Sequence, residues 1–432
     1  MTELEISILR DRQIRHVRLL MWLLLIMLHL ITSFHRVSFN VVADLLTAEF
    51  NLTGAGLGNL AAAYTYMYVI MQIPGGILVD RLGSRKIACL TGLLMAAGSM
   101  TIGLAPTAPV VFLGRLLIGL GGSVVLINIF KFQAAWFRPA EFATMSGLAL
   151  LISTSGSLLA ATPLALAVDA FGWRHSFFSF GLSTVLVALL CWIVVRNNPV
   201  DRFGQAARAA AGSPAAGESM MLTSATVKQV LANRRIWIPF LLNMGTYSGF
   251  VVFAGTWGVS YLVHGYRFTV EHASIYMLIA YLGYMIGAPG AGYLSDRLGS
   301  RKKPALVLVG CTVLFWFLLA AWPGGVLPVW LLYPLCLLIG IGGAATVMSF
   351  PMAREVSIPG CTGLVTAAVN MGVFLGLAIL QPLFGLILDA GWGGLMIDGA
   401  RVYPIRAYQT GFAVILVFAS LSFVATLFHR ED

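Results

Sequence analysis

The stretch GGILVDRLGSRK, at residues 75–86, returns in nearly the same form as AGYLSDRLGSRK, at residues 291–302. Asp80 in the first copy and Asp296 in the second are separated by half of the 432-residue length. Each copy places an acidic residue beside a glycine and several basic residues. A long motif that recurs at half-length indicates an internal duplication.

Two further pairs of matching segments accompany this repeat in the same order. LLIGLGG at 116–122 corresponds to LLIGIGG at 337–343, and PLALAVDAFGW at 163–173 corresponds to PLFGLILDAGW at 382–392. Three matched pairs in one order indicate that the chain consists of two related halves. Duplicated halves in a very apolar chain are typical of membrane transporters.

The composition excludes a water-soluble globular protein. Hydrophobic residues make up 59% of the chain and charged residues only 10%, whereas soluble domains have about 45–50% apolar and about 25% charged residues. Backbone polar groups in lipid must be satisfied within the segment, so the spans should be helices. The alternating ten-residue segments of an outer-membrane barrel are not found.

Twelve apolar stretches are long enough to cross a bilayer, each about 20 residues or more. Their approximate bounds are 18–43, 56–79, 87–105, 109–134, 143–168, 175–195, 236–261, 273–294, 304–322, 328–350, 362–388 and 409–428. The sequence therefore predicts an all-α integral membrane protein with twelve transmembrane helices in two six-helix pseudo-repeats.

Lysine and arginine residues are distributed unequally between the two sets of span ends. One set, which includes both copies of the basic turn, carries most of the 27. The other carries only Arg174, Arg267, Arg401 and Arg406. The positive-inside rule places the basic set and both termini in the cytoplasm, with the bacterial inner membrane as the expected location.

The polar segment at 197–230 is rich in Ala, Gly and Ser and predicts a flexible cytoplasmic linker. It separates a first six-helix bundle at 1–196 from a second at 231–432. The net charge of +10 comes from short turns rather than a soluble basic face, so nucleic-acid binding is not expected. The five cysteines are scattered through apolar spans and predict neither a disulfide framework nor a metal site.

The chain resembles the major facilitator superfamily over nearly all of its length. Gly76-x3-Asp80-Arg81-x-Gly83-x-Arg85-Lys86 is similar to the signature between the second and third helices of that family. The second copy resembles the echo of that signature, and Gly114-Arg115-x3-Gly119-x-Gly121 resembles the motif of the fourth helix. The general style is similar to bacterial sugar-phosphate or organic-anion permeases. The Gly-Pro motif of many drug/proton antiporters is not matched at 147–163.

The two basic turns are candidates for a gate at the cytoplasmic surface. The resemblance implies that the first turn docks onto the eleventh helix and favours the outward-facing state. The alternative is that the turns only set the topology. The residues assigned to gating are Gly76, Asp80, Arg81, Gly83, Arg85, Lys86, Gly292, Asp296, Arg297, Gly299, Arg301 and Lys302.

The first span carries a polar stripe. His29, Ser33, Arg36 and Asn40 are spaced so that they share one helix face. A charge in the middle of a span costs about 2.5–3.5 kcal/mol on the insertion scale, so Arg36 should face a wet cavity. Its planar guanidinium suits capture of an anion. The alternatives are that Arg36 snorkels to the outer interface and that His29 is merely hydrogen-bonded.

Other spans contribute polar and aromatic side chains that could line a cavity or simply pack. Arg115 is favoured over Lys131 as the inward-facing cation of the 109–134 span. The full set of candidate substrate-binding residues is His29, Arg36, Asn40, Tyr64, Tyr68, Gln72, Arg115, Asn243, Tyr247, Trp257, Asn370 and Gln381.

The expected function follows from charge. No Asp or Glu lies in the middle of a predicted span, so the cavity should be positive and attract a small organic anion. The sequence predicts a monomeric secondary transporter that works by alternating access, as a symporter with a proton or another coupling ion. No cofactor, ATP site or catalytic centre is expected. A multidrug or amphiphile exporter and a transporter-like solute sensor remain as alternatives.

Overall fold

The computed structural model describes residues 3–197, 228–230, 232–357, 362–397 and 400–431. The first half contains α1 (Glu3–Val37), α2 (Phe39–Phe50), α3 (Gly54–Gly103), α4 (Ala108–Trp136), α5 (Pro139–Leu159) and α6 (Thr162–Val194). The second half begins with η1 (Arg234–Ile236), α10 (Trp237–Val252), η2 (Phe253–Trp257), α11 (Gly258–Tyr266) and α12 (Val270–Leu298). It continues with α13 (Lys302–Ala321), η3 (Pro323–Gly325), α14 (Val329–Gly343), α15 (Thr346–Glu355) and α16 (Thr362–Ala390). It ends with the hairpin β1 (Met396–Ile397) and β2 (Ala400–Arg401), followed by α17 (Ile405–Leu427).

Two glycines divide continuous helices into separate crossings. Gly83 in α3 has φ 78° and Gly172 in α6 has φ 77°, a backbone region that residues with a Cβ rarely adopt. Ten stretches of the described residues are long and apolar enough to cross a membrane. One of them, Met145–Val194, bends at Gly172, and the arm of α3 before Gly83 adds another crossing. The prediction of twelve crossings is therefore confirmed.

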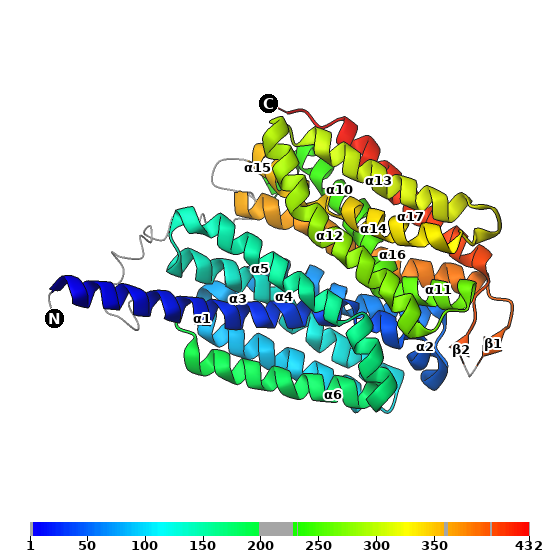
Figure 1. Cartoon of the computed structure of the whole chain (residues 1–432), viewed down its shortest axis with the longest axis horizontal. Helices are drawn as coiled ribbons and strands as arrows, with labels where there is room; N and C mark the ends of the chain where they lie inside the picture. The colour runs from blue at the N-terminus through cyan, green and yellow to red at the C-terminus, as the bar shows by residue number, and fades with distance from the viewer. Residues whose placement is uncertain (1–2, 198–227, 231, 358–361, 398–399, 432) are drawn as a thin grey trace.

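The two halves lie side by side with their helices roughly parallel to the long axis (Figure 1). Within the first half, α3 packs against α4 and α6, and α1 packs against α5. Within the second, α12 packs against α14, and α10 packs against α16 and α17. The halves meet where α3 contacts α16 and where α5 and α6 contact α12.

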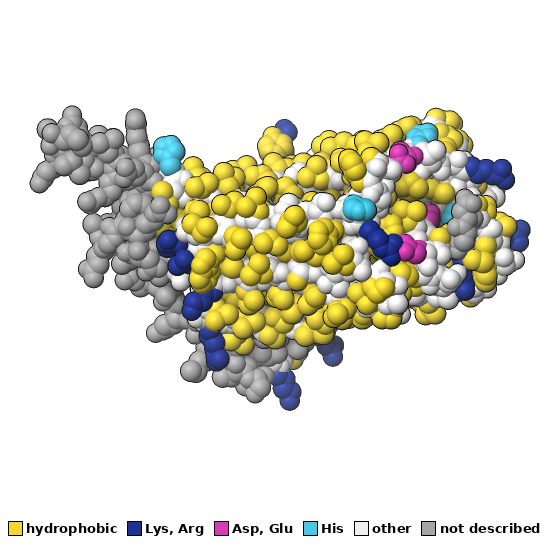
Figure 2. All heavy atoms as spheres, turned by 90° about the horizontal axis from the view of Figure 1, so that it is seen from below, with side chains coloured by type: hydrophobic (Ala, Val, Ile, Leu, Met, Phe, Trp, Pro, Cys, Tyr) yellow, Lys and Arg dark blue, Asp and Glu magenta, His cyan; other side chains and the backbone are white. Residues whose placement is uncertain are grey.

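The two ends of the molecule differ in charge. The end that holds the turns at 81–86 and 297–302 is called here the basic end, and the end that holds α2, α11 and the β1–β2 hairpin is called the hairpin end. On the face shown in Figure 2, hydrophobic side chains cover the middle, and Lys and Arg lie near the N-terminal end of the molecule and also toward the opposite end. Asp and Glu appear toward the opposite end. A hydrophobic band between polar ends is what a membrane-spanning protein requires.

Candidate functional site

Arg36 is the charged group of the candidate site. It lies near the end of α1, is partly buried, and donates from Nη2 to the Ser33 hydroxyl at 3.0 Å. Among the described residues it forms no ion pair with a carboxylate. A guanidinium has five N–H donors, so most of its capacity is not used by the Ser33 bond.

Tyrosines from both halves lie near Arg36. Tyr247, Tyr64, Tyr68, Tyr281 and Tyr284 are close enough to interact with it electrostatically. These side chains come from α3, α10 and α12, which meet between the halves. The sequence predicts Tyr64, Tyr68 and Tyr247 as site residues, whereas Tyr281 is not among the predicted residues. The signal that could have found it is its spacing of three residues from Tyr284, which puts both on one helix face.

Ring contacts join the tyrosines across the interface. Tyr68 stacks on Phe374 of α16 with ring centroids 4.2 Å apart, and its hydroxyl donates to the Gly122 carbonyl at 2.9 Å. In the second half, the Tyr247 and Tyr284 rings lie 5.3 Å apart. The result is a positive centre inside an aromatic and hydroxyl-bearing wall, which can hold an anion by charge and orient it by hydrogen bonds.

Arg115 has a different environment from the one the sequence predicts for a cavity cation. Its side chain is 1% exposed. Its guanidinium donates to three backbone carbonyls, those of Leu60 (3.1 Å), His35 (2.7 Å) and Ala61 (2.8 Å). It also lies over the Phe39 ring at 4.8 Å. These contacts tie α4 to α1, α2 and α3, so Arg115 acts here as an internal tether of the first half.

Two other basic candidates also have protein partners. His29 is buried, and its Nδ1 lies 2.6 Å from the Ser153 hydroxyl of α5. This contact agrees with the alternative that His29 is hydrogen-bonded within the protein and does not bind substrate. Lys131 donates to the Val79 carbonyl at 2.7 Å near the basic end. Arg36 is therefore the candidate cation whose described contacts leave it open to a ligand.

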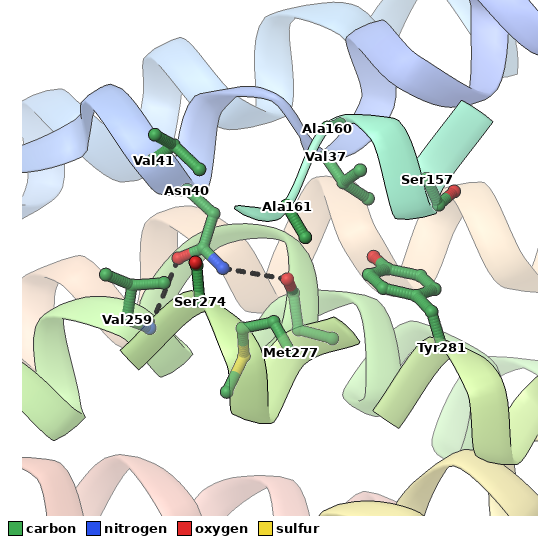
Figure 3. A pocket seen from close by; sticks show the side chains of 11 residues that line it. Val37, Asn40, Val41, Ser157, Ala160, Ala161, Val259, Ser274, Met277 and Tyr281 are labelled. Atoms are coloured by element: carbon green, nitrogen blue, oxygen red, sulfur yellow. Dashed lines mark hydrogen bonds between the residues drawn. The ribbon is translucent and has the colours of Figure 1, made fainter. Parts of the chain in front are cut away.

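Asn40 connects the halves rather than facing the Arg36 side chain. Its Nδ2 donates to the Ala254 carbonyl at 2.8 Å, and its Oδ1 accepts from the Val259 N–H at 3.3 Å. Figure 3 shows the amide inserted between these two backbone groups. The surrounding crevice has no room for a water molecule. In this conformation Asn40 therefore seals the hairpin end and has no free group for substrate.

The remaining polar candidates divide into bonded and unbonded groups. Asn243 is fully buried, donates to the Val369 carbonyl at 3.1 Å and accepts from Thr346 at 2.7 Å. Gln381 donates to Thr256 at 3.0 Å. The Trp257 ring stacks on Phe384, and its buried Nε1 has no hydrogen-bond partner among the described residues. The partly buried side chains of Gln72 and Asn370 form no hydrogen bond with any described residue.

A comparison with known proteins places this architecture in a family. The sequence model of the Major Facilitator Superfamily matches residues 25–380 and 259–432. The chain belongs to the Major Facilitator Superfamily. Its members are transporters, and the chain is accordingly a membrane transport protein rather than an enzyme.

Relatives within the superfamily cover most of the chain at low identity. An uncharacterized transporter of Bacillus subtilis (strain 168), YybO, is 24% identical over 96% of each chain. A probable sulfoacetate transporter of Cupriavidus necator, SauU, is 24% identical over 64% of each chain. A hexuronate transporter of Bacillus subtilis (strain 168) is 24% identical over 67% of this chain and 68% of its own. The named substrates of the last two are organic acids.

The fold of this superfamily member also resembles solved transporters. A crystal structure of a bacterial homologue of the human lysosomal transporter Spinster, in an inward-facing and unoccupied conformation, superimposes with a TM-score of 0.73. The two sequences are 16% identical, with 95% of this chain and 97% of the other covered. At that identity the likeness supports the fold.

The superfamily signature turns of the two halves each bind a hydrogen-bonding side chain from the segment that follows the last helix of their half. In the first, the Arg85 N–H donates to the side chain of Asn197, three residues after the end of α6, at 3.0 Å. In the second, Glu431, which follows α17, accepts from the Lys302 N–H at 2.7 Å, from Ser300 at 2.9 Å and from the Arg301 N–H. A neutral amide thus caps one turn and a carboxylate the other. The Asp80 side chain lies outside the described part of the structure.

Glu431→Gln is expected to lower the free energy of unfolding by up to about 1 kcal/mol at neutral pH, because an anion at a helix N-terminus is lost. Burial alone would raise the pKa of Glu431, but hydrogen bonds from Lys302, Ser300 and Arg301 hold that pKa below its ordinary value. The stabilisation is therefore present above the unfolded-state pKa and disappears as the pH falls through the lower folded value. Thermal unfolding in detergent should separate the two proteins at pH 7 and not in strong acid.

Direct hydrogen bonds between the halves gather at the hairpin end of this superfamily member. Among the described residues, α2 bonds to η2 and α11, the start of α3 bonds to the end of α16, and Thr162 of α6 bonds to Ser274 of α12 at 3.2 Å. Asp44 contributes by accepting from Ser260 at 2.9 Å. No such bond joins the described residues of the basic end. The halves are thus fastened at the hairpin end.

Proposed function

We propose that this protein is a secondary active transporter that carries a small organic anion by alternating access. The observation that carries the proposal is Arg36, a partly buried guanidinium without a described carboxylate partner, with tyrosines of both halves near enough to interact with it electrostatically. A substrate carboxylate or sulfonate would supply the missing counter-charge. Relatives named for sulfoacetate and hexuronate support this substrate class.

The position of the site between the halves suits alternating access. Tyr64 and Tyr68 belong to the first half, and Tyr247, Tyr281 and Tyr284 belong to the second. A bound anion would contact both halves and neutralise the charge between them, which lowers the cost of bringing them together around it. The bundles would be residues 1–196 and 231–432, with 197–230 as the linker.

The conformation follows from where the halves are fastened. With the basic end in the cytoplasm, as the positive-inside rule indicates, the sealed hairpin end faces outward and the structure corresponds to an inward-facing state. Both termini would then be cytoplasmic, in a bacterial inner membrane. We further propose symport with a coupling ion and function as a monomer. The turns at 80–86 and 296–302 would hold the basic end shut when the hairpin end opens.

The test is uptake by proteoliposomes that contain the purified protein. Sulfoacetate, a hexuronate and glucarate should drive counterflow, whereas a neutral sugar of similar size should not. A matched thermal-shift series would report binding separately from flux. Stabilisation by neutral amphiphiles, with no response to any of the organic acids, would contradict the anion assignment and favour an amphiphile exporter.

A further inference from the structure

Asp389 makes an unusual set of contacts at the hairpin end. It lies at the end of α16, and its carboxylate accepts from the backbone N–H groups of Gly54 (2.6 Å) and Ala55 (2.7 Å). These are the first residues of α3, which belongs to the other half. The first N–H groups of a helix have no acceptor within it, and the helix dipole favours a negative charge there. An acid of one half thus caps a helix of the other.

The same carboxylate is held in place by its own half. Arg401 of the β2 strand donates from Nη1 to Oδ1 at 3.2 Å, and the Tyr403 hydroxyl donates to Oδ1 at 3.1 Å. The Asp389 side chain is only 20% exposed. The hairpin and the segment after it therefore aim this carboxylate at the start of α3, rather than leaving it to solvent.

Asn40 makes the reciprocal contact from the first half to the second. In the π-helical turn η2, the Gly258 N–H bonds to the Phe253 carbonyl five residues before it. The next pair in that register would be Val259 and Ala254. The Asn40 amide stands between them and bonds to both (Figure 3). A side chain of α2 thus replaces one backbone hydrogen bond in the crossing that consists of α10, η2 and α11.

We propose that Asp389 and Asn40 form a two-point latch that keeps the hairpin end closed. Each supplies hydrogen bonds to helix backbone groups of the opposite half, and opening that end breaks all four bonds together. Close backbone packing reinforces the latch, since a Cβ added at Gly58 of α3 would lie 2.8 Å from the Pro382 Cα of α16. This inference rests on the proposed alternating access, and it assigns the hairpin end its own lock, opposite the basic turns.

The internal duplication provides a matched control. Asp169, also followed by alanine, lies in the matching segment of the first half, PLALAVDAFGW, but it is exposed and forms no hydrogen bond or ion pair with any described residue. The two acids thus share a sequence context and differ in their contacts. The same substitution at both positions separates the loss of the latch from the general effect of removing an acid.

The experiment measures distances across the hairpin end by electron paramagnetic resonance. Spin labels are attached to cysteines at Ala170 and Leu395, which are exposed on the two halves, in a full-length variant without the native cysteines. The protein is reconstituted without substrate. Asp389→Asn should raise the ratio of the open to the closed population roughly tenfold or more, because charge-assisted hydrogen bonds are lost. Asp169→Asn should leave the distribution unchanged.

Two milder variants protect the test against misfolding. Arg401→Gln removes only the cation beside Asp389, and Tyr403→Phe removes a single hydroxyl; each should shift the distribution in the same direction by a smaller factor. Asn40→Ala should shift it independently of them. Identical distributions in Asp389→Asn, Asp169→Asn and the parent would overturn the latch. Because no substrate is present, that result would leave the Arg36 anion site untouched, and loss of anion binding would likewise leave the latch untouched.

Discussion

Arg36→Gln is expected to weaken organic-anion binding by roughly 10- to 150-fold, the loss of one charge-assisted hydrogen-bonding centre. The described structure offers no other unpaired cation among the tyrosines that could substitute for it. Glutamine keeps a polar side chain of moderate length but carries no charge. The measurement is isothermal titration or a thermal-shift titration with sulfoacetate and a hexuronate, at fixed ionic strength.

Two arginine variants accompany Arg36→Gln. Arg36→Lys keeps the charge but loses the planar fork, so it should bind with intermediate affinity. Arg174→Gln removes an arginine at the hairpin end that pairs with Glu49 at 2.5 Å, and it should bind anions normally. If Arg36→Gln binds every tested organic acid as tightly as the parent does, Arg36 is not the anion site.

Arg115→Ala is expected to lower the stability of the protein by about 3 kcal/mol or more, because several charge-assisted bonds are removed from a fully buried position. The His35 carbonyl lies just before the break between α1 and α2, where it accepts from Arg115 at 2.7 Å and from the Ser38 hydroxyl at 3.4 Å. The measurement is thermal unfolding in detergent, together with the yield of monodisperse protein.

The opposite outcome has a definite meaning. If Arg115→Ala folds with unchanged stability and instead loses anion binding, the guanidinium is a substrate ligand, as the sequence predicts from its motif. Arg115→Lys refines the comparison, since a compact ammonium group lacks the planar fork with which the guanidinium reaches the carbonyls of Leu60, Ala61 and His35. It should therefore be destabilised, though less than the alanine variant.

Some features of the site could be predicted because they depend on the residues of a single helix, through the free-energy cost of a charge in an apolar span or through helical spacing. A charged side chain such as Arg36 in an apolar span has a high free-energy cost unless it faces a cavity or a ligand. The sequence alone therefore indicates a functional role for it. The stripe of Tyr64 and Tyr68 follows from helical spacing. Arg115 carries the same local cost, but the structure compensates it with backbone carbonyls of neighbouring helices. Nothing in the linear sequence distinguishes these two solutions.

The latch residues illustrate the same limit. Asp389 and Asp169 lie in matching segments of the two halves, and the packing of α16 against the start of α3 gives Asp389 a helix to cap. Asn40 lies on the same predicted stripe as Arg36. The helix breaks at Ser38, between α1 and α2. Beyond this break, the Asn40 amide bonds to the backbone of η2 and not to Arg36.

The repeat GGILVDRLGSRK and its echo, with the apolar composition, by themselves determined the fold class, the twelve crossings and the family. These features depend on short stretches of neighbouring residues and can therefore be predicted from sequence. They are the length of an apolar span, the distribution of Lys and Arg between its ends, and the positive φ of a glycine turn. Only the tertiary structure decided that Arg36, and not Arg115, keeps free donors among the described residues. It also decided that hydrogen bonds between the halves lie at the hairpin end. Both depend on how helices that are far apart in the sequence rotate and pack against one another. The helix face on which an arginine lies decides whether it stays open to an anion, as Arg36 does, or binds backbone carbonyls, as Arg115 does.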